Sequence, residues 1–225
     1  MPHPNGIYTA QLDQMTQTLS QMGELIAQAL DFSESALEHH ERALGLQAKE
    51  LDKRINALNE QLEAQVIRLF THAAPFASDL RFVIAILKAS GSLERAGDLA
   101  KSTTKHMAKL DFSFSEDVLA ALRELVNVNR QMLAGVILSM RNRDVEQALE
   151  AWRMDDVADA ACRRVFEIIR HKMTQEPARA GQLADLLFAA KNFERMADYC
   201  ADIAKMVIYV VTGEHPHKDV LREQP

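Results

Sequence analysis

The stretch Glu94-Arg95-Ala96-Gly97-Asp98 recurs one hundred residues later as Glu194-Arg195-Met196-Ala197-Asp198. Both copies follow the pattern E-R-x-[AG]-D, and each lies near the end of a long amphipathic segment. Each places a glutamate and an aspartate four residues apart, which puts both on one face of a helix. The chain is therefore predicted to contain a duplicated helical unit with a candidate acidic site in each copy.

Composition favours helices throughout. The chain has 225 residues, 48% of them hydrophobic, with only eight glycines and six prolines. Such a length suits one large domain or two of about 100 residues. Because glycine and proline are the residues that interrupt helices, their scarcity predicts an all-α fold.

Charge and hydropathy exclude several functional classes. The net charge of −6 argues against direct binding of nucleic acid, which needs a basic face. No apolar run reaches the roughly 18 residues of a membrane span, and the N-terminus has no signal-peptide pattern. We therefore expect a cytoplasmic protein with no direct membrane insertion. Cys162 and Cys200 are expected to pack as small buried hydrophobic side chains in a reducing compartment.

Breaks in the apolar pattern divide the chain into six long antiparallel helices. Their predicted ranges are 7–37, 42–72, 76–110, 116–140, a fifth helix reaching about 173, and a sixth from Pro177 to a stop at Gly213. Ser113 and Glu116 match a capping box, and Asn142 or Asp144 is the expected N-cap of the fifth helix.

The two halves repeat. Asp52 and Asn56 in the second predicted helix correspond to Asp155 and Asp159 in the fifth, again about one hundred residues apart. The predicted organisation is a three-helix bundle over 1–110, a second over 111–215, and a polar tail over 216–225.

The carboxylates continue apolar lines on three of these helices. The line in the third helix is Leu80, Ile84, Leu87, Gly91, Glu94 and Asp98, which we expect to face the core. Leu183 leads towards Glu194 on the sixth helix, and Trp152 leads towards Asp155 and Asp159 on the fifth. On the second helix, Asp52 and Asn56 are expected on the flank of the apolar stripe.

A bound cation would explain carboxylates on core-facing lines, because unpaired buried charges are costly and neighbouring carboxylates repel. Oxygen ligands suit Mg, Mn or Fe, and Zn is also considered. The candidate metal ligands are Glu94, Asp98, Glu194, Asp198, Asp155, Asp159 and Asp52. The alternative is that these acids are partly exposed and pair with arginines, namely Arg95, Arg195, Arg163 or Arg164.

Catalytic motifs are absent from the sequence. It contains no glycine-rich phosphate loop, no nucleophile constellation and no helical Glu-x-x-His pair of the ferritin-like di-iron type. We therefore expect no enzyme. A metal-dependent helical enzyme or a metal-storage bundle using the paired carboxylates remains the alternative.

The signatures and their surroundings resemble the PhoU family of phosphate-transport accessory and regulatory proteins. The resemblance covers nearly the whole chain. It rests on Pro-Phe-Ala-Ser-Asp-Leu-Arg at 75–81, Leu-Glu-Arg-Ala-Gly-Asp at 93–98, Asn-Phe-Glu-Arg-Met-Ala-Asp at 192–198, Tyr-Val-Val-Thr-Gly-Glu at 209–214, and Met22-Gly23.

The resemblance implies two three-helix bundles, a homodimer, and metal clusters held by E/D-x-x-x-D motifs in some members. It also implies a regulatory adaptor between the ATPase subunit of the phosphate ABC transporter and a membrane sensor histidine kinase. Such adaptors restrain phosphate uptake and phosphate-starvation signalling when phosphate is plentiful. This chain departs from the family pattern at Ser102 and Asp202, where asparagine is usual, and at Met196-Ala197, where Ile-Gly is usual. Asn56 is neutral, so the second repeat is the stronger candidate for metal.

Overall fold

The computed structural model describes residues 6–39, 41–72, 77–110 and 114–217. Within these ranges the chain forms six long helices and no strand, which confirms the predicted all-α fold. The helices are α1 (Gly6–His39), α2 (Arg42–His72), α3 (Ala77–Met107), α4 (Glu116–Asn142), α5 (Val145–Gln175) and α6 (Ala180–Thr212).

Local signals define several helix ends. Oδ1 of Asp144 accepts hydrogen bonds from the backbone N–H groups of Glu146 and Gln147, so Asp144 caps α5 as predicted. Gly213 ends α6 with φ of 81°, a conformation that glycine adopts without a Cβ penalty. Two expectations need revision. Pro177 opens a short 3-10 turn (Pro177–Arg179) before α6, and the N-cap of α4 is Ser115. Ser113 lies outside the described residues.

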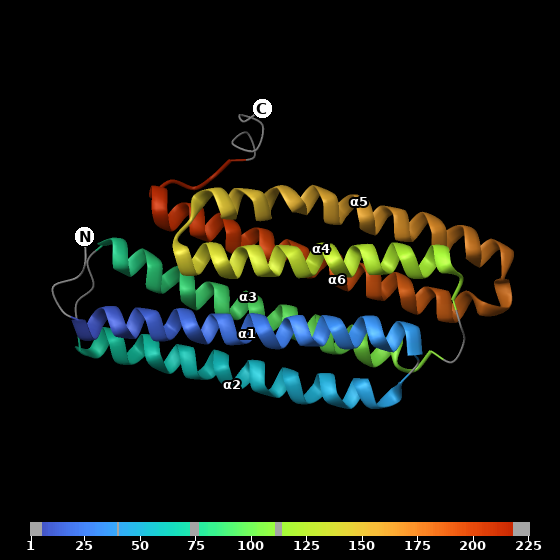
Figure 1. Cartoon of the computed structure of the whole chain (residues 1–225), viewed down its shortest axis with the longest axis horizontal. Helices are drawn as coiled ribbons and strands as arrows, with labels where there is room; N and C mark the ends of the chain where they lie inside the picture. Colours follow the sequence, from blue (N-terminus) through green and yellow to red (C-terminus); the bar gives the residue numbers. More distant parts are fainter. Residues whose placement is uncertain (1–5, 40, 73–76, 111–113, 218–225) are drawn as a thin grey trace.

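The helices form two bundles that lie side by side along the long axis of the molecule (Figure 1). Helices α1, α2 and α3 pack on one another, and so do α4, α5 and α6. The bundles meet where α3 packs on α6 and α1 packs on α4, so one continuous hydrophobic core runs through both. Phe193 of α6 and Met22 of α1 are fully buried in it.

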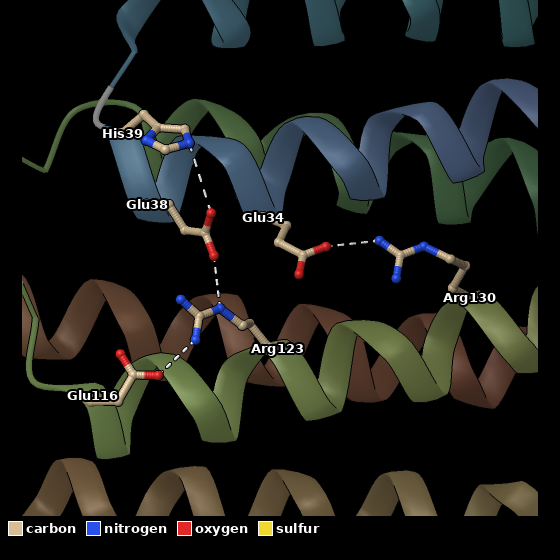
Figure 2. A network of polar contacts seen from close by, with 6 residues as sticks. All are labelled: Glu34, Glu38, His39, Glu116, Arg123 and Arg130. Atoms are coloured by element: carbon tan, nitrogen blue, oxygen red, sulfur yellow. Dashed lines mark hydrogen bonds and ion pairs between the residues drawn. The ribbon is translucent and has the colours of Figure 1, made fainter.

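Ion pairs cross the seam between α1 and α4. Arg123 of α4 donates to Glu38 of α1 at 2.7 Å, and Arg130 of α4 donates to Glu34 of α1 at 2.9 Å (Figure 2). Within α4, Arg123 also donates to Glu116 at 2.8 Å. These arginines are one-third exposed, so each pair adds little stability by itself. They connect α1 to α4 along the exposed edge of the seam between the two bundles.

The expected core-facing line on α3 is wrong in its first half. Leu80 and Ile84 are 39% and 41% exposed. Helix α3 packs against α1, α2 and α6, and these neighbours bury the adjacent line that includes Val83, Ile86 and Leu93. The signature carboxylates therefore lie at the edge of the core.

No described helix is long and apolar enough to cross a membrane.

Candidate functional site: two carboxylate clusters

The first cluster joins α2 to α3. Asp52, predicted on the flank of the apolar stripe of α2, is only 6% exposed and contacts Lys101 of α3. The Lys101 ammonium, one turn beyond the signature, donates to Oδ2 of Asp52 at 2.8 Å and also to Asp98. The first-repeat acids Asp52 and Asp98 are thus held together by a lysine of the same chain.

The glycine of the first signature allows α2 and α3 to approach closely. A Cβ built on Gly97 would lie 2.8 Å from Cδ1 of Ile55 and 3.3 Å from its Cγ2. Ile55 is itself buried, one turn beyond Asp52 on the same helix. In the second signature the equivalent residue, Ala197, is 1% exposed. The small residue of E-R-x-[AG]-D therefore serves packing, and it brings the α2 carboxylate within reach of α3.

Burial dominates the electrostatics of the first cluster. It raises the pKa of Asp52, and the opposing effect of Lys101 does not cancel the shift. Burial also raises the pKa of Glu94, with a further contribution from the charge of Asp98. For Lys101, burial acts to lower the pKa, but its contacts with Asp52 and Asp98 outweigh burial and raise it. The lysine therefore stays charged and remains the counter-ion of the cluster.

The second cluster lies between α5 and α6. Asp155 and Asp159 on α5 and Glu194 on α6 are half-buried, whereas Asp198 is exposed. Lys191 pairs with Glu194 from the preceding turn of α6. Cations therefore lie at the edge of this cluster as well, but no lysine bridges its two helices as Lys101 does in the first.

Asp155 is the most perturbed carboxyl of this cluster. Burial, followed by the charges of Asp198 and Asp159, raises the pKa of Asp155 to about 6. Although Asp198 is exposed, partial desolvation of its carboxylate and the charges of Glu194 and Asp159 likewise raise its pKa. The carboxylates of α5 and α6 therefore perturb one another, and the opposing charges of Lys205 and Lys191 do not cancel the rise in pKa of Asp155 and Asp198.

The predicted arginine partners are only partly those observed. Arg163 pairs loosely with Asp159 at 3.8 Å, whereas Arg164 pairs with Glu124 of α4 at 2.6 Å. Arg95 and Arg195 are exposed. The close partners are instead Lys101 and Lys191, which sequence reasoning missed. Their three-residue spacing from Asp98 and Glu194 was the available signal.

The arrangement does not gather a set of metal ligands. Among the described residues, no three His, Cys, Asp or Glu side chains are placed together so as to hold a metal ion. In the first cluster, Lys101 already occupies the position between Asp52 and Asp98. The second cluster has donors of suitable chemistry for a hard cation, but they do not converge. The predicted metal assignment therefore stays a prediction.

The two cysteines are free and buried, as the sequence predicts. Burial raises the pKa of the Cys200 thiol to about 12 and that of Cys162 to about 11. Because the thiolate is the reactive form, these thiols are inert towards nucleophilic chemistry at neutral pH.

Comparison with known proteins identifies both repeats. The sequence model of the PhoU domain matches residues 19–107 and again residues 122–207. A phosphate-specific transport system accessory protein PhoU homolog of Zymomonas mobilis is 34% identical over 168 residues, covering 75% of this chain and 71% of that protein. A protein of the same description in Caulobacter vibrioides is 31% identical, with 76% and 77% covered.

Solved structures agree with the sequence comparison. PhoU from Pseudomonas aeruginosa superposes with a TM-score of 0.86 at 25% identity, covering 92% of this chain and all of that one. The phosphate transport system regulatory protein PhoU from Streptococcus pneumoniae shares the fold, with a TM-score of 0.84 at 24% identity over 93% and 99% of the two chains. With its two matched repeats and its duplicated acidic signature, the chain belongs to the PhoU family.

Proposed function

We propose that this protein is a regulatory accessory protein of phosphate transport. In this role it restrains uptake by a phosphate ABC transporter and represses phosphate-starvation signalling when phosphate is plentiful. The observation that carries the proposal is the match of both repeats to the PhoU domain. Relatives that cover most of the chain are named as phosphate-specific transport accessory proteins.

The proposed mode of action is protein contact. The partners are the ATPase subunit of the transporter and a membrane sensor histidine kinase, with the adaptor acting from the cytoplasm as a homodimer. Inert thiols are consistent with a role in binding. So is the large exposed area of two long bundles, which offers separate faces to separate partners.

The test is deletion in the native host under high phosphate. Uptake of radiolabelled phosphate and a starvation-promoter reporter are both expected to rise, and a plasmid copy of the gene is expected to restore both. Unchanged uptake and unchanged reporter activity would overturn the proposal. Co-purification of the tagged protein with the ATPase subunit or the kinase would support the contact mechanism, and sedimentation of the pure protein would test the dimer.

A second proposal concerns metal binding or storage by the α5–α6 carboxylates. It is favoured by the pKa of Asp155, which burial and two neighbouring carboxylates raise to about 6. A bound Mg, Mn, Fe or Zn ion would relieve that repulsion. Because the four side chains do not converge, ion binding would require them to rotate towards one another.

A further inference from the structure

A strongly basic groove lies between the first half of α2 and the last half of α3. The cavity has a volume of about 680 Å³, and among the described residues that line it Asp52 is the only carboxylate. The lining cations are Arg42, Lys49, Lys53, Lys101, Lys105 and Lys109. Six cations in one groove are unexpected on a chain whose net charge is −6.

Four of these six cations form no ion pair with any carboxylate that the structure describes. Lys101 is held by Asp52 and Asp98, and Lys53 pairs with Glu50 on its own helix at 2.7 Å. Across the described ranges, no carboxylate forms an ion pair with the other four, which are Arg42, Lys49, Lys105 and Lys109. Repulsion between like charges at i and i+4 costs a few tenths of a kcal/mol, so the groove is charged at some expense to stability.

The second repeat shows that the fold does not require these cations. Because Asp52 corresponds to Asp155 and Glu94 to Glu194, each groove residue has an equivalent on α5 or α6. Only Lys105 has a basic equivalent, Lys205. The other five cations are replaced, in order, by Val145, Trp152, Asp156, Ala201 and Tyr209. The same helix pair therefore folds without a basic groove, and the cations of the first repeat call for a binding explanation.

The shape of the groove narrows the class of ligand. Arg42 and Lys53 are eleven residues apart on α2, so the cations extend over about 16 Å at 1.5 Å per residue. A single phosphate reaches only part of that row. The volume lies within the roughly 300–1,000 Å³ of small-molecule sites. The rest of the acidic surface would repel a long nucleic acid.

From these observations we infer that the α2–α3 groove binds a ligand with two or more linked phosphates. Ammonium groups bind phosphate as point charges, and a row of them matches a chain of phosphates. The ligand is either inorganic polyphosphate or a nucleoside triphosphate. Leu46, 70% exposed in the same groove, offers apolar contact to a base. No phosphate loop is needed, because side chains supply the charge. The inference stands apart from the proposed regulatory role.

The first probe is inorganic tripolyphosphate, titrated calorimetrically into the full-length protein at low salt. The groove variant K49Q/K105Q/K109Q removes three unpaired, exposed cations. Its matched control, K88Q/R170Q/R195Q, removes the same charge from exposed positions outside the groove. We expect the groove variant to lose at least about tenfold in affinity and the control less than about twofold. Circular dichroism melting curves check that both variants fold.

Separate arms identify the source of the phosphate chain. If ATP binds more tightly than tripolyphosphate, and if L46S weakens the binding of ATP, the groove is assigned to a nucleotide. If ATP and tripolyphosphate bind with equal affinity, and L46S changes neither affinity, the groove is assigned to inorganic polyphosphate.

Several results would overturn the inference. These are no tripolyphosphate binding by the native protein, equal losses in the groove and control variants, or orthophosphate binding as tightly as tripolyphosphate. Binding of a glutamate-rich peptide that tripolyphosphate does not displace would show instead that the groove takes an acidic protein segment.

Discussion

The Lys101 ammonium lies 2.8 Å from Oδ2 of Asp52, and this ion pair joins α3 to α2 beside the first signature. The Asp52 side chain is 8% exposed and that of Lys101 28%. Removing one partner of such a pair leaves a charge with no counter-ion in a region of little water. The pair therefore makes the first cluster a structural element of the bundle.

We predict that Lys101→Met lowers the free energy of unfolding by about 2–4 kcal/mol, because Asp52 then stays buried without its cation. Adding Asp52→Asn should recover most of that loss, since no buried charge remains. Urea denaturation of the two variants measures both values. Lys105→Met, one turn further along α3 at an exposed position, is the matched control and should change stability little. If K101M and K105M were equally stable, the ion pair would have no structural role.

The second cluster makes the stability of the folded protein depend on pH. The pKa of Asp155 rises from 3.8 to about 6 in the folded protein, so the folded state binds this proton more tightly than the unfolded state does. Stability contributed by protonation is therefore fully present below about pH 4 and is lost as the pH rises through about 6. Two pKa units correspond to about 3 kcal/mol, and partial exposure reduces that figure.

We accordingly predict that Asp155→Asn raises the free energy of unfolding by about 1–2 kcal/mol at pH 7.5. Near pH 4 it should have little effect. Denaturation curves at the two pH values give the comparison. Asp156→Asn changes an exposed neighbour of the same charge and should shift stability by only a few tenths of a kcal/mol. A gain from D155N that is the same at both pH values would contradict the assignment of the penalty to ionised Asp155.

Sequence periodicity predicted the six helices because caps and breakers such as Asp144 and Gly213 act locally. It was wrong about which line of α3 is buried, since Leu80 and Ile84 are apolar but exposed. The apolar pattern shows which residues are suited to burial, whereas the positions of α1, α2 and α6 determine which of them are buried. For the same reason, the sequence did not predict the burial of Asp52, which depends on the close approach of α3 to α2 at Gly97.

Sequence reasoning pointed to the carboxylates of the candidate site but missed the lysines that pair with them. The duplicated signature marks Glu94, Asp98, Glu194 and Asp198 directly. Lys101 and Lys191 lie outside the signature, and a long side chain can reach several partners. The contact of Lys101 with Asp52 joins two residues that are 49 positions apart in the sequence, so only the packing of α2 on α3 determines it.

Gly97 tests the role of the small residue in the signature. We predict that Gly97→Val lowers the free energy of unfolding by about 1–3 kcal/mol, because its side chain would collide with buried Ile55. Gly91→Val on the same helix is the matched control, since a Cβ at Gly91 meets no atom within 4 Å. Thermal denaturation of both variants isolates packing from helix propensity. Equal losses would show that the close approach of α2 and α3 does not restrict this position.

Metal binding is tested most sharply by comparing the two repeats. If the α5–α6 carboxylates bind a cation, adding Mn²⁺ at about ten times its dissociation constant should stabilise the native protein by about 1.4 kcal/mol, which raises the melting temperature by roughly 3–5 °C. Glu194→Gln with Asp198→Asn should abolish the shift without unfolding the bundle. The variant Glu94→Gln with Asp98→Asn should keep the manganese-dependent shift in melting temperature, because in the first repeat Lys101 already neutralises Asp52. The assignment of metal to the second repeat would be refuted if the E194Q/D198N protein showed the same manganese-dependent shift, or if the native protein showed none. The acids of the second repeat would then be only ion-pair partners, Glu194 of Lys191 and Asp159 of Arg163.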